Sequence, residues 1–149
     1  MTGSHRLSDR VVWLVGRASL HAQRLVQSHF AEGELRKPHY GVLASLADVG
    51  PATQAPLADR LGIDRSDMVS LLDELEALRY VTRRPDPTDR RRKIVEITGR
   101  GTTALQKLDL LVYAADDDLL APLTPSERRT LARLLARVLP DADGVHPNS

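Results

Sequence analysis

Apolar residues recur at steps of three and four along most of the chain, which predicts a mainly α-helical fold. In the first such stretch, from residue 7 to about residue 30, one stripe of positions is apolar: Leu7, Val11, Leu14, Ala18 and Leu25. A helix with such a stripe needs another apolar surface to cover it. We therefore expect a long first helix that is packed against a partner surface.

Three shorter helices are predicted in the middle of the chain. The first runs from Pro38, whose missing N–H costs nothing at a helix start, to Val49. A short helix follows Thr53 and ends at Gly62, a residue suited to a left-handed C-terminal position. Asp64 has the chemistry of an N-cap for the third helix. The buried face of that helix is formed by residues at helical spacing: Met68, Leu71, Leu72, Leu75 and Leu78.

After Tyr80 the pattern becomes that of a β-hairpin. Residues 81–84 and 93–98 are predicted strands, and the Pro- and Asp-rich stretch 85–92 is the turn between them. A long helix follows over 101–120, and a capping box from Thr124 to Glu127 begins a last helix that ends near Pro140. Residues 141–149 are predicted to be disordered. We expect a single domain over residues 1–149 with about six helices and a two-stranded β wing.

Composition excludes several kinds of chemistry. The chain has 149 residues, of which 42% are hydrophobic, and it has no cysteine. Without cysteine there is no disulfide, thiolate nucleophile, Cys-based zinc site or thiol redox switch within this chain. No apolar run reaches the length of a membrane span, and the N-terminal stretch lacks the hydrophobic core of a signal peptide. We expect a soluble, cytoplasmic protein that does not contact a membrane.

The charge is distributed unevenly, although the formal net charge is only +1. Between Arg79 and Arg100 there are eight basic residues and three acidic ones, so this stretch carries +5 and the remainder −4. A short basic island on a mildly acidic body is typical of a nucleic-acid-binding surface, whereas a solvated charge run is the alternative interpretation.

The order of these elements is that of a winged helix-turn-helix, in which one helix enters a DNA major groove. Four stretches carry a resemblance to a known family: Pro56-Leu-Ala-Asp-Arg-Leu-Gly-Ile-Asp-Arg-Ser66, Leu71-Leu-Asp-Glu-Leu-Glu76, Asp89-Arg-Arg91 and Ile97-Thr-Gly-Arg-Gly101. On these residues the chain resembles the MarR (multiple antibiotic resistance regulator) family of bacterial transcription factors, over about residues 7–139.

The resemblance implies a DNA-binding transcriptional repressor that works as a homodimer on a pseudo-palindromic operator. Residues 7–35 and 101–140 would supply the dimerisation helices from both termini, and residues 38–100 the winged-helix part that binds double-stranded DNA. The apolar stripes of the first and last two helices agree with this, because a small winged domain is too small to cover them. A two-fold dimer reads half-sites about one helical turn apart, roughly 34 Å.

Two groups of residues are predicted to contact DNA. On the third of the middle helices, the positions opposite the leucine face are Arg65, Ser66, Val69, Ser70 and Asp73. In the wing, the resemblance implies that Asp89 orients Arg91 and that Arg90 or Arg91 enters the minor groove, while Arg92 and Lys93 contact phosphate or cover the strand.

The sequence departs from the family pattern on this helix. Family members commonly carry basic residues near positions 70 and 74, where this chain has Ser70 and Glu74, and a glycine at the position of Arg79. An acidic helix repels phosphate, so affinity has to depend on Arg65 and the wing.

A small aromatic acid or phenolic effector is implied by the resemblance. An aromatic wall with a cation suits such an anion, whereas packing at a dimer interface is the alternative role for the same side chains. The candidate residues are Trp13, Arg17, His21, His39, Tyr40 and Tyr113.

No cofactor, metal site or enzyme activity is expected. The chain has no glycine-rich phosphate loop and no nucleophile elbow, and its histidines are not spaced as metal ligands. The competing function is a winged-helix module for protein–protein assembly with little or no DNA binding, since an acidic recognition helix would suit a basic protein partner.

Overall fold

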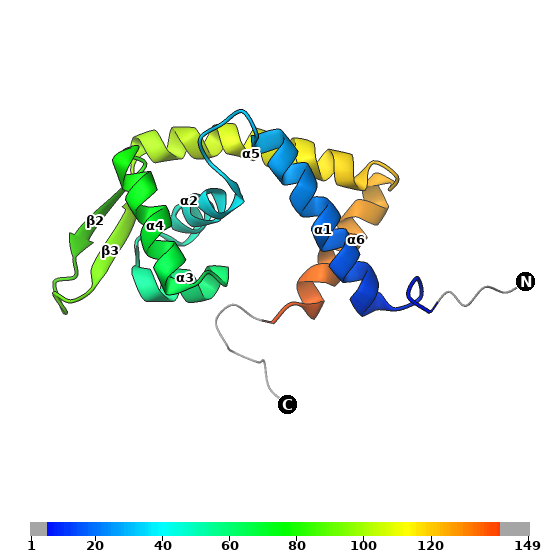
Figure 1. The fold of residues 1–149 in the computed structure, drawn as a ribbon, viewed down its shortest axis with the longest axis horizontal. Coiled ribbons are helices and arrows are strands. Elements are labelled where there is room, and N and C mark those ends of the chain that lie inside the picture. The colour runs from blue at the N-terminus through cyan, green and yellow to red at the C-terminus, as the bar shows by residue number, and fades with distance from the viewer. Residues whose placement is uncertain (1–5, 141–149) are drawn as a thin grey trace, which may run out of the picture.

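The computed structural model describes residues 6–140, and it is mainly helical with one small sheet (Figure 1). The elements are α1 (Val11–Phe30), α2 (Lys37–Val49), β1 (Ala52–Thr53), α3 (Gln54–Leu61), α4 (Arg65–Ala77), β2 (Val81–Pro85), β3 (Lys93–Ile97), α5 (Gly99–Leu120) and α6 (Pro125–Val138). The predicted fold class, helices around a β-hairpin wing, is confirmed. The tail predicted to be disordered, residues 141–149, lies outside the described residues.

The main differences from the prediction are two helix starts and one additional strand. Helix α1 begins at Val11 rather than Leu7, because residues 6–9 form turns and the Arg10 N–H donates to the Leu7 carbonyl at 3.2 Å. Helix α5 begins at Gly99 rather than residue 101, because Thr98 is its N-cap and accepts from the Gly101 N–H at 3.0 Å. Strand β1 was not predicted at all.

The sheet has three strands in the order β1-β3-β2, all antiparallel. Strands β2 and β3 pair from Val81 with Ile97 to Pro85 with Lys93. On the other side of β3, Ala52 pairs with Val95 and Thr53 with Ile94. The two-residue strand β1 leads directly into α3, so the base of the wing is joined to the start of the helix-turn-helix.

The hydrophobic core lies in the winged part of the molecule. Fully buried side chains come from α2, α3, α4, β2 and β3: Leu43, Leu57, Met68, Leu72, Leu75, Val81 and Val95. Phe30 at the end of α1 packs edge-on against Tyr40 and joins α1 to this core. None of the described helices is long and apolar enough to span a bilayer.

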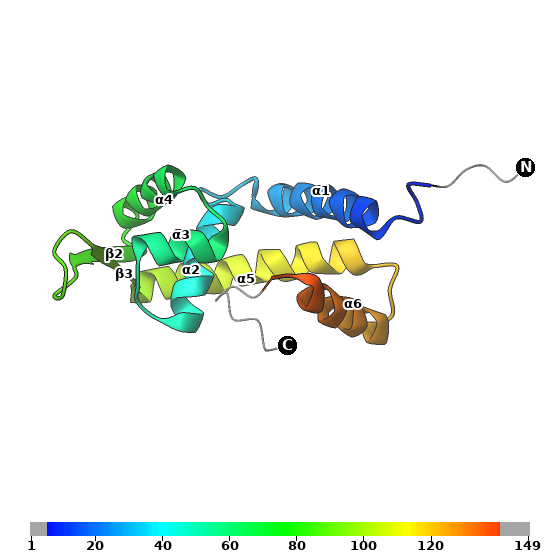
Figure 2. The same cartoon turned by 90° about the horizontal axis from the view of Figure 1, so that it is seen from below.

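Helix α5 runs from the winged part to the opposite end of the molecule, where α1 and α6 lie on either side of it (Figures 1 and 2). Phe30 is the buried residue of α1, and α6 has none. The capping box predicted for α6 is confirmed, since Thr124 and Glu127 exchange side-chain bonds with each other's backbone N–H at 3.2 and 3.0 Å.

A close backbone contact joins the wing to α5. The Thr98 N–H donates to the Tyr80 carbonyl at 3.0 Å, and the Thr98 hydroxyl donates to the Arg79 carbonyl at 2.7 Å. Gly101 lies against the same carbonyl of Tyr80, and a Cβ at this position would overlap it. Arg79, where the family pattern has glycine, adopts a left-handed backbone with φ of 64°.

Candidate nucleic-acid interface

Helix α4 presents one buried and one exposed face, as the leucine spacing predicted. Met68, Leu71, Leu72 and Leu75 are buried. All five predicted DNA-contact residues of the helix are exposed: Arg65, Ser66, Val69, Ser70 and Asp73. The exposed face is therefore available to a groove of DNA, which admits an α-helix.

The start of α4 is fixed by its N-cap. The Asp64 carboxylate accepts from the Ser66 N–H at 2.8 Å and from the Ser66 hydroxyl at 2.5 Å. These bonds lower the pKa of the Asp64 carboxyl below its ordinary value. The Ser66 hydroxyl is thus used within the helix start, and the Ser70 hydroxyl donates to the Ser66 carbonyl at 3.4 Å.

The tip of the wing is a turn built on two aspartates. Asp86 accepts from the Thr88 N–H at 2.9 Å and from its hydroxyl at 2.8 Å, which together hold the pKa of the Asp86 carboxyl below its ordinary value. The Asp86 N–H donates to the Arg92 carbonyl at 3.0 Å. Asp89 accepts from the Arg91 N–H at 3.1 Å and from the Arg91 Nε at 3.2 Å.

The Asp89 carboxylate therefore holds the Arg91 side chain while that side chain remains 92% exposed. Arg92 lies 3.6 Å from the other oxygen of Asp89. An exposed guanidinium held by one carboxylate keeps most of its donors free for another anion.

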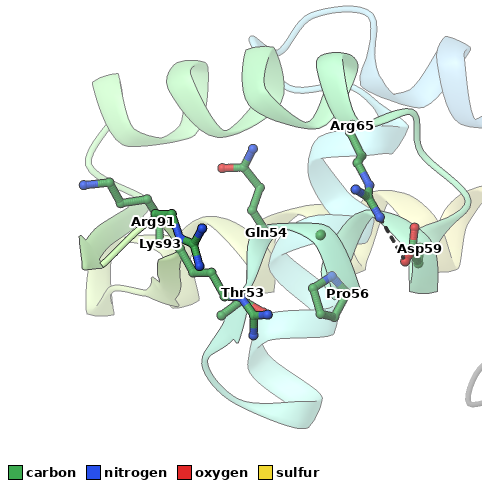
Figure 3. Close-up of a pocket in the computed structure, with 9 residues that line it drawn as sticks. Thr53, Gln54, Pro56, Asp59, Arg65, Arg91 and Lys93 are labelled. Carbon is green, nitrogen blue, oxygen red and sulfur yellow. Dashed lines mark ion pairs between the residues drawn. The ribbon is translucent and has the colours of Figure 1, made fainter. Parts of the chain in front are cut away.

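A cavity of about 580 Å³ lies between the wing, the start of α3 and the start of α4 (Figure 3). Arg65 from α4, and Arg91, Arg92 and Lys93 from the wing, line it together with the first residues of α3. One acidic side chain, Asp59, also lines it and lies 3.9 Å from Arg65. The structure thus gathers predicted residues of the helix and of the wing around one basic groove.

Asp73 has a different setting from the other four exposed residues of α4. Its carboxylate accepts from Arg83 of β2 at 2.6 Å. Arg83 was not singled out in the sequence, because the separation of ten residues gives no sign of contact between a helix and a strand. The roles of Asp86 and Thr88 were missed too, although Asp-Pro-Thr is a recognisable turn signal.

The six candidate effector residues fall into different settings. Trp13, Arg17 and His21 are exposed on α1. His39 is fully buried, and both of its ring nitrogens are hydrogen-bonded: Nδ1 accepts from the Arg36 N–H at 3.0 Å, and Nε2 lies 2.5 Å from Glu74.

The two tyrosines belong to α2 and α5, and Tyr40 joins these two helices. The Tyr40 hydroxyl donates to Asp109 at 2.8 Å, and exposed Tyr113 follows Asp109 by one helical turn on α5. Burial, and then the bond to Asp109, raise the pKa of Tyr40 to about 12. Among the residues that the structure describes, no group of three or more His, Asp or Glu side chains is arranged to hold a metal ion.

Comparison with known proteins identifies what this chain resembles. The model of the MarR family matches residues 34–92. A Thauera aromatica protein named for transcriptional regulation of the hcr operon is 36% identical over 99 residues, which are 66% of this chain and 60% of that protein. The chain thus spans less than two thirds of that relative. The HTH-type transcriptional repressor NicR of Pseudomonas putida is 26% identical over 137 residues, which cover 92% of this chain and 86% of NicR.

A solved structure extends the similarity to nearly the whole fold. The transcriptional repressor CouR, bound to a 23-mer DNA duplex, superposes with a TM-score of 0.82 and 28% sequence identity. The match covers 93% of this chain and 98% of CouR.

Proposed function

Since this chain belongs to the MarR family of winged helix-turn-helix transcriptional regulators, which are not enzymes, we propose that it is a repressor that binds a pseudo-palindromic operator as a homodimer. In this proposal α4 enters the major groove and the wing tip contacts the minor groove. Such a regulator acts in the cytoplasm, where bacterial DNA lies.

The observation that carries the proposal is the basic groove between α4 and the wing. Its cations come from two elements that the fold brings together, and Arg91 is both exposed and held by Asp89. The size of the groove and its positive charge suit the sugar-phosphate backbone of DNA, which dominates protein–DNA affinity. CouR, with the same fold, is itself bound to a DNA duplex.

Dimerisation is supported by apolar side chains outside the core. Val12 on α1, Leu110 on α5 and Val138 on α6 are 88%, 68% and 72% exposed in the single chain. Residues 7–35 and 101–140 would pair with the same segments of a second copy, because exposed apolar surface of this extent is unfavourable in water.

Release by a small aromatic acid or phenol is the second part of the proposal. Tyr40 of α2 is bonded to Asp109 of α5, one helical turn from Tyr113, and Trp13, Arg17 and His21 form an exposed row on α1. An effector bound beside Tyr40 and Tyr113 would touch α2 and α5, one of the proposed dimerisation helices.

DNA binding is tested by selecting operators from a random pool and measuring affinity at several salt concentrations. Arg91→Ala is expected to weaken binding to all sequences and to lower the salt dependence by about one phosphate contact. Arg65→Ala is expected to change base preference as well. A salt-independent response, or no binding, would favour a protein–protein module instead. Unchanged affinity in both variants would place the DNA-contacting surface elsewhere.

A further inference from the structure

The C-terminal half of α4 carries three carboxylates, Asp73, Glu74 and Glu76, that a DNA-reading helix has no evident need for. They lie near the negative end of the helix dipole, where acidic groups are unfavourable. They would also repel the phosphates of a bound duplex. Some other interaction in the protein has to compensate for them.

Arg83 of β2 binds two of these carboxylates from the wing side. Its Nη2 lies 2.6 Å from Asp73, and its Nε and Nη2 donate to the two oxygens of Glu76 at 3.3 and 3.2 Å. The Arg83 side chain is only 19% exposed, so this fork-shaped contact is partly shielded from solvent. The bonds from Arg83 lower the pKa of Glu76 and raise the pKa of Arg83 itself.

His39 of α2 binds the third carboxylate from another side. Because its Nδ1 accepts the Arg36 N–H, the ring proton is on Nε2 and is donated to Glu74 across 2.5 Å. The guanidinium of Arg36 lies 3.8 Å from the same oxygen. His39 is fully buried, so its position is set by the core of the winged part.

The two contacts act on different flanks of α4. At 3.6 residues per turn, Asp73 and Glu76 project within about 60° of each other, whereas Glu74 projects about 100° from Asp73 and about 160° from Glu76. The hydrophobic effect that buries the leucine face underneath is non-directional, so by itself it selects the rotation of the helix less sharply than directional bonds do. Charged hydrogen bonds on two flanks restrict such rotations, because each bond requires a defined angle.

We propose that Arg83 and His39 are positioning residues that fix the rotation of α4 about its own axis and thereby determine which bases its N-terminal residues reach. The inference rests on the proposed DNA-binding function. The carboxylates are part of this positioning device, and the positive charges of Arg83 and Arg36 offset part of their repulsion for DNA.

Arg83→Lys is the sharpest test, because lysine keeps the charge but cannot form the fork. Arg84→Lys is the matched control: Arg84 is the next residue of the same strand and pairs at 3.8 Å with Glu96 of β3 rather than with α4. The readout is the ratio of affinities for the selected operator and for a scrambled duplex of the same length.

We expect the ratio to fall roughly tenfold in Arg83→Lys, which is about the loss of discrimination caused by misplacing one base contact. Affinity for the scrambled duplex should be kept. The control should stay within about twofold of the unmodified protein, as for an ordinary surface substitution. An unchanged ratio in Arg83→Lys would overturn the proposal.

Glu74→Gln tests the other flank at a half-exposed position. This variant is expected to lower the ratio of operator affinity to scrambled-duplex affinity. An equal rise in affinity for both duplexes would mean that Glu74 only repels phosphate and would overturn its positioning role.

Amide hydrogen exchange of the DNA-free protein separates this inference from the proposed function. Faster exchange in α4 of Arg83→Lys, but not of Arg84→Lys, supports the positioning role even if no operator is found, and equal rates overturn it.

Discussion

Replacing Gly101 with alanine tests the contact that joins the wing to α5. A Cβ at this position would overlap the Tyr80 carbonyl oxygen and lie 2.9 Å from both the Tyr80 carbonyl carbon and Cγ1 of Ile97. Carbon atoms in contact are normally about 3.5–4.0 Å apart, so the backbone at Tyr80 would have to move by more than about half an ångström. That movement would strain the bond of 3.0 Å from the Thr98 N–H to the same oxygen.

The expected change in the free energy of unfolding combines one favourable contribution with two unfavourable ones. Alanine is favoured over glycine within a helix by about 0.5–1 kcal/mol. Overpacking of a tight site costs about 1–3 kcal/mol, and weakening the Thr98 bond adds to it by about 1 kcal/mol. We therefore expect Gly101→Ala to lower the free energy of unfolding by about 1–3 kcal/mol.

Gly99 is the matched control, two residues earlier at the start of the same helix. A Cβ there meets nothing within 4 Å, so Gly99→Ala is expected to be neutral or stabilising by up to about 1 kcal/mol. Urea unfolding at one fixed protein concentration compares the two variants, since the stability of the proposed dimer would depend on concentration. Equal midpoints for Gly101→Ala and Gly99→Ala would refute the steric argument.

Three further predictions concern the backbone, a titrating group and assembly. Arg79→Gly should stabilise the protein by up to about 1 kcal/mol. A left-handed backbone costs a residue with a Cβ about 1–2 kcal/mol, and glycine avoids this cost but loses part of the gain because it has more conformational entropy in the unfolded state. A lower urea midpoint for the variant would contradict this prediction. The Tyr40 pKa of about 12 lies above its ordinary 10.0, so the stability that it contributes is full below pH 10 and is lost as pH rises from 10 toward 12. Tyr40→Phe should remove the part of the stability loss at alkaline pH that comes from ionisation of Tyr40. Urea unfolding at about pH 9 and about pH 11 tests this, and an equal loss of stability in both proteins would exclude a contribution from Tyr40. Val12→Asp should shift light scattering from twice the mass of one 16.5 kDa chain toward a single chain, and an intact dimer would place the interface elsewhere.

Local signals in the sequence predicted most of the fold. Gly62 ends α3 in the left-handed conformation expected of it, with φ of 64°, and Asp64 and Thr124 are the N-caps of α4 and α6. Each of these features depends on residues within one turn of a helix. Strand β1 was missed, because its two residues are a strand only through pairing with β3, some forty positions later.

The candidate site was predictable only in part, for the same reason. The Asp89 and Arg91 pair lies within one turn, so a motif can signal it. His39 was assigned to the effector group because it follows Pro38 beside Tyr40, but its ring is bonded to Glu74, 35 positions away. Arg83 and Asp73 meet only after the wing folds back against α4, and nothing in their spacing indicates that contact.

The pairing of β1 with β3 has a mechanical consequence for how the wing meets a duplex. Ala52 and Thr53 pair with β3 and lead directly into α3. A rigid-body rotation of the hairpin would therefore also displace the helix-turn-helix. Beyond the pair of Pro85 with Lys93 the ladder ends, and the turn 86–92 is held by its own local bonds. In the proposed complex, adaptation to grooves of different width is therefore expected of this tip, while the paired strands beneath it keep its distance from α4.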